Sequence, residues 1–405
     1  MANKQNISIL SHSDCCGCRA CGDACPVSCI SFEKDGEGFF YPVVDNGACI
    51  HCGKCVKVCP ELNPHGNEAS KDVLAAYAKS SAMRKNGSSG GLFGVIASFI
   101  IEKGGKVWGA AFDENLQLKH TCATTIDELE PLFRSKYLQS DTHGCYKQIA
   151  DDLKAGVLTL FAGTPCQCNA LRNYIGSDNE NLYLIDIICH GVPSQDLFDR
   201  SVRWLEDKRN CKIRSFSFRS KYKGAQHPQA FSYICEKNGR ERRINGLHYQ
   251  FPFYFGFQKY ITLRPSCYSC KWARTERAGD ITLGDFWGVE KLVHDLDPKT
   301  GVSEVLTNSE KGKKLIAQII GHSLIWSESF HISQATADNG CLKAPTKLKP
   351  ERAEFFEALN SEPFDKVVEK HLVSKRQWIF DLYYSMPRFL RSITRKIMDK
   401  RMRYE

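Results

Sequence analysis

Eight of the twenty cysteines in this chain occur in two copies of one pattern, Cys-x2-Cys-x2-Cys-x3-Cys-Pro. They are Cys15, Cys18, Cys21, Cys25, Cys49, Cys52, Cys55 and Cys59. This spacing is typical of segments that hold two 4Fe–4S clusters, in which the fourth cysteine of each run binds the other cluster. We therefore expect two clusters with these ligands: Cys15, Cys18, Cys21 and Cys59 for one, and Cys25, Cys49, Cys52 and Cys55 for the other.

A pair of structural zinc sites is the alternative for these eight cysteines. Zinc sites usually combine two Cys-x2-Cys pairs, whereas here four cysteines precede a proline in each copy. The spacing therefore favours iron–sulfur clusters, and a zinc-stapled binding module is the weaker interpretation. Cys16 and Cys29 lie beside the ligands but outside the repeat, and we expect both to be buried packing residues.

Composition restricts the remaining possibilities. The chain has 405 residues, 42% hydrophobic and 25% charged, which is ordinary for a globular protein of two or three domains. It begins with no secretory signal pattern, and its longest apolar stretch, residues 91–101, is too short to span a membrane. Many cysteines in a chain without a signal favour metal and redox chemistry over disulfides, so we expect a reducing cytoplasm.

The net charge of +9 is concentrated at the end of the chain. Residues 374–405 contain nine Lys or Arg and three Asp or Glu, so they carry a net charge of +6, which is two-thirds of the total. The rest of the chain has nearly equal numbers of basic and acidic residues. We therefore expect no nucleic-acid binding. Apolar residues in this tail have the spacing of one helix face, which predicts a helix that lies on an anionic membrane surface or, alternatively, docks on the body or on a partner. These residues are Phe389, Leu390, Ile393, Ile397 and Met398.

The pattern along the chain predicts three regions. Residues 1–62 form a ferredoxin-like domain for two clusters, with a short hairpin at 39–43 over the clusters, and residues 61–72 form a polar linker. Residues 73–345 alternate strands and helices, which predicts a mixed α/β domain whose halves meet near 165–185. Residues 346–405 predict a helical, basic extension. The expected fold class is α+β or α/β: a small cluster domain, a mixed α/β domain and a helical tail.

Four further cysteines are candidates for a site at the ends of predicted strands, where open α/β sheets bind their ligands. Cys166 and Cys189 follow or end the predicted strands 157–162 and 182–189, and Cys267 and Cys270 form a Cys-x2-Cys pair. The carboxyl ends of neighbouring strands lie side by side, so the four side chains can converge on a third 4Fe–4S cluster. The alternative is that the strand-end cysteines are small buried residues and the pair is half of a zinc site.

A glycine-rich segment precedes an apolar helix that extends to about Glu102. Ser88-Ser89-Gly90-Gly91 combines capping serines with glycines whose backbone N–H groups can face a phosphate, although an ordinary capped helix start is the alternative. Arg134-Ser135-Lys136-Tyr137 offers a cation and a ring, either to a flavin or as a solvated surface turn. No G-x-G-x-x-G follows a strand and no G-x-x-x-x-G-K-S/T occurs, so the common nucleotide folds are not expected.

Six motifs occur in order along the chain. They are Ser88-Ser89-Gly90-Gly91, Ser135-Lys136-Tyr137, Gly163-Thr164-Pro165-Cys166-Gln167, Cys189-His190-Gly191-Val192-Pro193-Ser194, Arg264-Pro265-Ser266-Cys267-Tyr268-Ser269-Cys270 and Gly284-Asp285-Phe286-Trp287-Gly288. Together they resemble the coenzyme F420 hydrogenase/dehydrogenase beta-subunit family. The resemblance extends from about residue 12 to residue 345, and the stretch after 346 is outside it.

This resemblance implies a flavin-binding domain at 73–345. Members of the family bind FAD beside an iron–sulfur cluster; some pass electrons to the deazaflavin coenzyme F420, and relatives reduce other small molecules. By similarity, the flavin-site candidates are Ser88, Ser89, Gly90, Gly91, Ser135, Lys136, Tyr137, Gly163 and Thr164. The candidate ligands of the cluster beside the flavin are Cys166, Cys189, Cys267 and Cys270. Cys168 departs from the aliphatic residue that we expect at its position, so it competes as a ligand.

We therefore expect an iron–sulfur flavoprotein oxidoreductase. Electrons from ferredoxin or another low-potential redox protein enter at the cluster domain and reach a small-molecule acceptor through the third cluster and FAD. His190 is a candidate proton donor, although a structural hydrogen bond is the more common role for such a histidine. The alternative is a non-catalytic electron-transfer subunit of a larger hydrogenase or dehydrogenase complex.

Overall fold

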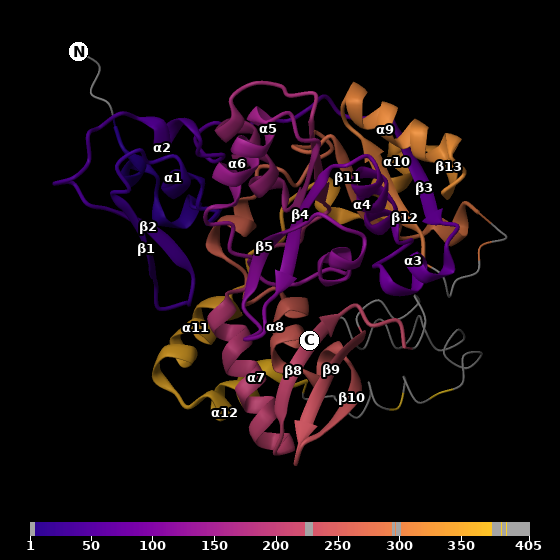
Figure 1. Ribbon diagram of the computed structural model, residues 1–405. Helices are drawn as coiled ribbons and strands as arrows, with labels where there is room; N and C mark the ends of the chain where they lie inside the picture. Colours follow the sequence, from indigo (N-terminus) through magenta and orange to yellow (C-terminus); the bar gives the residue numbers. More distant parts are fainter. Residues whose placement is uncertain are drawn as a thin grey trace.

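The computed structural model describes residues 5–222, 230–293, 296, 301–374, 382 and 386. Figure 1 shows an N-terminal module beside a large sheet with helices, and a smaller sheet with its own helices below them. The predicted class, a mixed α/β fold with an N-terminal ferredoxin-like region, is confirmed. Within these described residues, no helix is both long enough and apolar enough to cross a membrane.

The N-terminal module is built from two short helices and one hairpin. The helices are α1 (Ala20–Asp23) and α2 (Lys54–Lys57), and the antiparallel strands are β1 (Ile30–Lys34) and β2 (Phe40–Val44). The predicted hairpin therefore exists, and its Phe32 and Val44 pack against the core that contains Cys21, Cys29, Cys55 and Cys59. Phe39 and Tyr41 are buried in the core that contains Phe198 and Phe355, so the hairpin attaches the module to the rest of the protein.

The central element is an eight-stranded mixed sheet with the order β13-β3-β12-β11-β7-β6-β4-β5. Its four inner strands β4, β6, β7 and β11 are parallel, and antiparallel strands flank them on both sides. The strands are β3 (Asp72–Ala78), β4 (Lys106–Phe112), β5 (Leu118–Ala123), β6 (Thr159–Gly163), β7 (Leu182–Ile187), β11 (Ile281–Asp285), β12 (Ser303–Thr307) and β13 (Ile325–His331).

Helices cover both faces of this sheet. Neighbouring strand residues point to opposite faces, so Leu160 packs in one core and Phe161 in the other. Helices α4 (Leu92–Glu102) and α9 (Glu310–Gly321) cover the first face. Helices α5 (Cys145–Lys154) and α6 (Pro165–Ile175) cover the second face, and Cys16, Cys18 and Ala20 of the N-terminal module join the same core. The cysteine module therefore lies against the α5–α6 face (Figure 1).

The smaller unit is a three-stranded antiparallel sheet with an aromatic core. Its strands are β8 (Lys212–Phe218), β9 (Ala230–Lys237) and β10 (Arg240–Leu247), in the order β10-β9-β8. The helices of the same core are α7 (Gln195–Arg209), α8 (Pro252–Lys259), α11 (Glu351–Ser361) and α12 (Phe364–Val367), followed by a π-helical turn at Val368–Leu372. Two further helices, α3 (Ser81–Asn86) and α10 (Ile332–Asp338), lie near β3, the strand next to the edge strand β13.

The chain between residues 61 and 72 is held firmly, although the sequence predicts a polar linker there. The backbone N–H of His65 donates to Asn169 Oδ1 at 2.9 Å, and that of Asn67 donates to the Arg277 carbonyl at 2.8 Å. The five apolar tail residues from Phe389 onward lie outside the described part of the chain, so the membrane-helix hypothesis stays a prediction.

A buried ion pair fixes the centre of the large sheet. Asp186 on β7 is fully buried and accepts hydrogen bonds from Arg277 Nε and Nη2 at 3.2 and 3.0 Å. Thr282 Oγ1 and the Gly279 backbone N–H also donate to this carboxylate, at 2.7 and 2.8 Å. The carboxylate thus joins β7 to the segment that enters β11, next to the Cys267–Cys270 pair in the chain.

We expect Asp186→Asn to lower the free energy of unfolding by about 3–5 kcal/mol, because it leaves the buried Arg277 guanidinium without a counter-charge. Denaturant unfolding followed by circular dichroism measures this change. Asp207→Asn is the control, since Asp207 is exposed on α7 and its change should stay within about 0.5 kcal/mol. Equal stability of the two variants would contradict the structural role of the pair.

Candidate functional site

The first group of cysteines surrounds the loop that leads into α1. Burial raises the pKa of the Cys21 thiol, and the neighbouring Cys15, Cys59 and Cys55 raise it further. Cys59 belongs to the second sequence run, and the structure places it near Cys15 and Cys21 of the first run. The division of the eight cysteines between two clusters stays a prediction. The loop bends at Gly17, whose φ of +69° is a conformation that glycine adopts readily.

The second group lies beside the first, around a small cavity. The cavity is lined by Cys25, Cys49, Cys52 and Cys55, and by one further thiol, Cys29. The Sγ atoms of Cys25 and Cys29 are 3.4 Å apart. Cys29 is buried, as the sequence predicts, but it lies among the candidate ligands rather than in a remote core.

The third group lines a cavity of about 50 Å³ at the carboxyl ends of β6 and β7. Its candidate ligands are Cys166, Cys189, Cys267 and Cys270. Four thiols around an enclosed space are the donor set that a 4Fe–4S cluster takes.

Cys168 is outside this cavity. It is completely buried on the sheet side of α6, and its thiol donates to the Ile185 carbonyl at 3.3 Å. Two residues correspond to about 200° around a helix, so Cys166 and Cys168 point in nearly opposite directions. The geometry therefore favours Cys166 over Cys168 as the ligand from this loop.

Cys16 connects the first and third groups. Its thiol lies close to the thiols of Cys166 and Cys18, and it lines the third cavity. Glu61 lines the same cavity, and burial raises the pKa of its carboxyl to about 7 although Lys271 opposes this shift. The sequence predicts only packing for Cys16 and gives no signal for Glu61, because neither residue belongs to a repeated pattern.

Arg264 ties the first and third groups together. Its guanidinium is completely buried, and Nε donates to the Cys15 carbonyl at 2.6 Å. Nη1 and Nη2 donate to Gln139 Oε1 and to the Phe40 carbonyl, both at 2.9 Å. Within the described chain no carboxylate pairs with Arg264, and all three acceptors are neutral. The cation therefore faces the thiols without a carboxylate counter-charge.

The flavin-site candidates lie together at the start of α4. Ser88 Oγ accepts from the Ser135 backbone N–H at 2.9 Å, which joins two of the sequence motifs. The exposed glycine N–H groups that the sequence predicts are not found, because Gly90 donates to Ser303 Oγ at 3.0 Å and Gly91 donates to the Ser88 carbonyl. A Cβ on Gly90 would lie 2.4 Å from the Ala76 carbonyl oxygen, so this glycine allows close packing against β3.

An ion pair that the sequence did not predict stabilises this region. Arg219 donates from Nη1 and Nη2 to the two oxygens of Asp285, both at 2.7 Å, and Nη1 also donates to the Tyr137 hydroxyl at 3.1 Å. Burial raises the pKa of Asp285, but Arg219 outweighs burial and the pKa is lowered. Asp285 is therefore ionised, and it fixes Arg219 and through it Tyr137, a flavin-site candidate.

Two further candidates, Gly163 and Thr164, end β6 beside Cys166. Gln167 Oε1 accepts from the Thr164 backbone N–H at 3.0 Å, which fixes the start of α6. The flavin-site candidates thus extend from the α4 start toward the third group of cysteines.

His190 lies in the turn after Cys189 and lines the third cavity. Its Nδ1 is 3.3 Å from Cys341 Sγ, and its carbonyl accepts from Thr346 Oγ1 at 2.7 Å. Burial lowers the pKa of the imidazole, so it is neutral at pH 7. These contacts hold the ring in place, as a structural histidine requires.

Comparison with known proteins identifies two parts of the chain. Residues 158–331 match the C-terminal model of the coenzyme F420 hydrogenase/dehydrogenase beta-subunit family. Residues 14–62 match a 4Fe–4S dicluster domain, and a second dicluster model matches residues 41–90. The resemblance found in the sequence motifs is therefore confirmed, and the first two groups of cysteines lie in a recognised iron–sulfur region.

Individual relatives share less of the chain. The ferredoxin-type protein NapF of Haemophilus influenzae is 44% identical over 43 residues, which are 11% of this chain and 24% of NapF. The chain thus spans about a quarter of the length of this curated relative. A chain of the F420-reducing nickel–iron hydrogenase complex from Methanosarcina barkeri, from a xenon-derivatised structure, is 14% identical, with a TM-score of 0.43 over 78% of this chain and 93% of that one.

We expect Arg264→Gln to make the reduction potential of at least one cluster more negative, because a cation stabilises the reduced, more negative state. A unit charge roughly 8 Å away at an effective dielectric constant of about 20 contributes about 2 kcal/mol. That energy corresponds to roughly 90 mV for a one-electron couple. A redox titration followed by electron paramagnetic resonance measures the shift.

Two matched variants separate charge from packing in this test. Arg264→Lys keeps the charge and should keep the potentials close to those of the unmodified chain. Arg200→Gln removes a cation whose contacts are Asp196 and the Leu359 carbonyl rather than the cysteine groups. This variant should leave the reduction potentials unchanged. Unchanged potentials in Arg264→Gln with full iron content would show that the guanidinium has no electrostatic role.

Proposed function

We propose that this chain, whose residues 158–331 belong to the coenzyme F420 hydrogenase/dehydrogenase beta-subunit family, is an iron–sulfur flavoprotein oxidoreductase. It takes electrons from a low-potential, ferredoxin-like donor and delivers them to a small-molecule acceptor. Its expected cofactors are the two 4Fe–4S clusters of the N-terminal module, a third 4Fe–4S cluster and FAD.

The contact between the first and third groups of cysteines is the observation that carries this proposal. Cys16 lies close to Cys18 of the first group and to Cys166 of the third, and Cys21 lies near Cys55 of the second group. The three groups therefore form an unbroken series from the N-terminal module to the carboxyl edge of the large sheet. Clusters bound there would accept and release single electrons.

The second group marks the side where a donor docks. Ile50 and Val27 line its cavity, and their exposed fractions are 60% and 42%. Exposed apolar side chains beside a redox centre suit a small, short-lived protein contact. The third group is at the opposite end of the series, so a donor at the second group and an acceptor at the sheet edge do not compete.

The acceptor end is the region between the third group and the start of α4. The residues that we propose to hold FAD are Ser88, Ser135, Tyr137, Gly163 and Thr164. A flavin supplies the change from single electrons to a two-electron hydride transfer. Coenzyme F420 is one acceptor compatible with the family, and other small molecules are equally compatible.

A second candidate function follows from the family description itself. The matched model is that of a beta subunit, which is one part of a larger enzyme. In that case the chain passes electrons to or from a partner hydrogenase or dehydrogenase and binds no substrate alone.

We expect anaerobically purified chain to contain about 12 iron atoms and about 12 acid-labile sulfides, as three 4Fe–4S clusters require, together with FAD. Cys166→Ala should reduce both counts by about a third, because it removes a ligand of the third cluster. Cys168→Ala is the matched control on the same helix, and it should keep full iron, since its thiol lies in the sheet core. Full iron in Cys166→Ala would remove the third cluster from the proposal.

Acceptor reduction separates the two candidate functions. We expect the lone chain, reduced with dithionite, to be reoxidised by a free acceptor such as coenzyme F420 or FMN, and stopped-flow absorbance measures this rate. A chain with full iron and FAD that is reoxidised only after a partner subunit is added supports the subunit function instead.

A further inference from the structure

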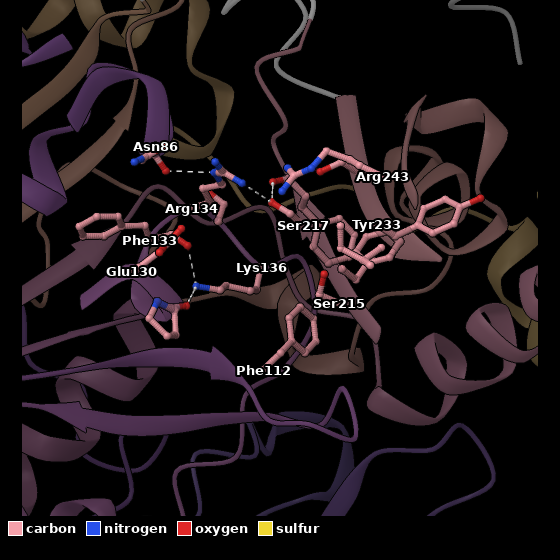
Figure 2. A pocket seen from close by; sticks show the side chains of 16 residues that line it. Asn86, Phe112, Glu130, Phe133, Arg134, Lys136, Ser215, Ser217, Tyr233 and Arg243 are labelled. Atoms are coloured by element: carbon pink, nitrogen blue, oxygen red, sulfur yellow. Dashed lines mark hydrogen bonds between the residues drawn. The ribbon is translucent and has the colours of Figure 1, made fainter. Parts of the chain in front are cut away.

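Two basic regions lie near the candidate sites, and their cations have different surroundings. One is the cavity of about 240 Å³ that Arg134 and Lys136 line (Figure 2), which contains flavin-site candidates. There Lys136 Nζ donates to the carbonyls of Pro131 and Phe133, both at 2.8 Å. The other is the strap, residues 340–350, which connects α10 to α11 and carries exposed cations.

The strap borders the third group of cysteines. Pro345 and Thr346 line the third cavity together with Cys189 and Cys267. Thr346 Oγ1 donates to the His190 carbonyl at 2.7 Å, so the strap is fixed to the turn that follows Cys189. The match to the family model ends at residue 331, and none of the six sequence motifs reaches the strap. The resemblance therefore assigns no role to it.

Both ends of the strap are held in place. At its start the backbone N–H groups of Lys343 and Ala344 donate to the Gly340 carbonyl, at 3.0 and 3.1 Å. At its end Arg352, in the first turn of α11, forms a two-pronged ion pair with Glu37 of the N-terminal module. The strap is therefore a preformed surface, and a partner that binds it does not have to order it first.

One large apolar side chain of the strap is exposed to solvent. Leu348 has an exposed fraction of 64%, the highest among the large apolar side chains of the described chain, and Ile50 follows with 60%. Ile50 lines the cavity of the second group, and Leu348 is two positions from Thr346, which lines the cavity of the third. The two most exposed apolar side chains therefore lie beside the cysteine groups at the two ends of the series.

Exposed lysines accompany this leucine. Lys347 and Lys349 flank it, Lys343 lies nearer the start of the strap, and residues 340–350 contain no Asp or Glu. Within the part of the chain that the structure describes, none of these three ammonium groups forms an ion pair or a hydrogen bond. Acidic residues resume at Glu351, in the first turn of α11, where they stabilise the helix start. The strap thus carries a net positive charge around one apolar side chain.

We infer that the strap is a docking surface for a small acidic electron-transfer protein. An apolar centre with a charged rim suits a small, short-lived redox contact, and opposite charge on the partner speeds the encounter. A single leucine offers too little apolar area to anchor the strap in a bilayer, where binding grows with buried apolar area.

This inference rests on the proposed function for the third cluster, and it adds a second place where a protein exchanges electrons with the chain. A partner docked on the strap lies beside the third group and not beside the second. The exchange moves one electron, which the partner loses and the protein gains, and no bond forms or breaks.

Carbodiimide cross-linking tests the inference, because the reagent joins a lysine to a carboxylate that lies against it. The anaerobically purified full chain is mixed with a small acidic 2Fe–2S ferredoxin of the plant type, and mass spectrometry locates the cross-linked lysines. We expect cross-links at Lys343, Lys347 and Lys349 that about 0.5 M salt suppresses. Cross-links at Lys54 and Lys57 are expected as well, because α2 lies beside the second group, where the proposed donor docks.

A double charge reversal, Lys347→Glu with Lys349→Glu, leaves Lys343 as the reporter. Each reversal removes an attraction and adds a repulsion, so the yield of the Lys343 cross-link should fall about tenfold at low salt. The cross-links in α2 should stay unchanged. Lys313→Glu with Lys314→Glu is the matched control, since it makes the same change of charge at exposed positions of α9 and should keep the Lys343 yield.

The outcomes separate this inference from the proposed function. Equal Lys343 yields in the two double variants, or cross-links in α2 alone, reject the strap as a docking surface and leave the proposed function intact. Strap cross-links to a second copy of the chain without ferredoxin, or binding to phosphatidylglycerol vesicles that the strap reversal abolishes, reject an acidic redox partner in favour of a dimer or a membrane. Strap cross-links to ferredoxin in a chain with iron for two clusters only would keep the docking surface and reject the third cluster.

Discussion

The Arg264 guanidinium holds the cysteine-rich module against the body of the protein. It is completely buried, and its three hydrogen bonds reach Cys15, Phe40 and Gln139, which lie in the cluster loop, the hairpin and the sheet domain. The Tyr41 ring lies 4.2 Å from the guanidinium carbon. A Cβ on Gly17 would lie 2.6 Å from Nη1, so only glycine allows the loop to approach this closely. Arg264 therefore helps to fix the orientation of the first group of cysteines relative to the third, together with the hydrogen bond from Gln139 Nε2 to the Cys16 carbonyl.

The large sheet explains why the third group and the flavin-site candidates occur at one edge. Strands β6, β7 and β11 are neighbours, and β6 and β11 each pair in parallel with β7. The carboxyl ends of parallel strands lie at the same edge of a sheet. The loops that follow β6, β7 and β11 therefore begin side by side, after Gly163, Ile187 and Asp285. The buried Asp186 carboxylate accepts from Arg277 and Thr282, which prevents β11 from sliding against β7. The third group of cysteines therefore lies at the ends of strands whose register the Asp186–Arg277 ion pair stabilises.

The sequence predicted the elements whose signals are local. The repeated cysteine spacing indicated the iron–sulfur region, and the apolar runs indicated the strands that the structure places at Thr159–Gly163 and Leu182–Ile187. Contacts between distant positions had no local signal. Arg264 and Cys15 are 249 positions apart, and nothing around Arg219 indicates that Asp285 is its partner. The role of Gly90 was misread for the same reason, because its close approach to Ala76 on another strand is visible only in three dimensions.

Three buried arginines show how the protein distributes charge around the cysteines. Arg277 pairs with Asp186, and Arg219 pairs with Asp285, so these two cations are neutralised within the fold. Arg264 has only neutral partners, and a buried cation without an anion costs several kcal/mol. Burial raises the pKa of the Cys59 thiol to about 11, so at pH 7 this thiol is protonated until a metal takes its place. When a cluster binds, the thiols lose their protons, and the cluster with its thiolates carries a net negative charge. This charge is the counter-charge that Arg264 lacks. Cluster assembly and docking of the N-terminal module therefore stabilise each other.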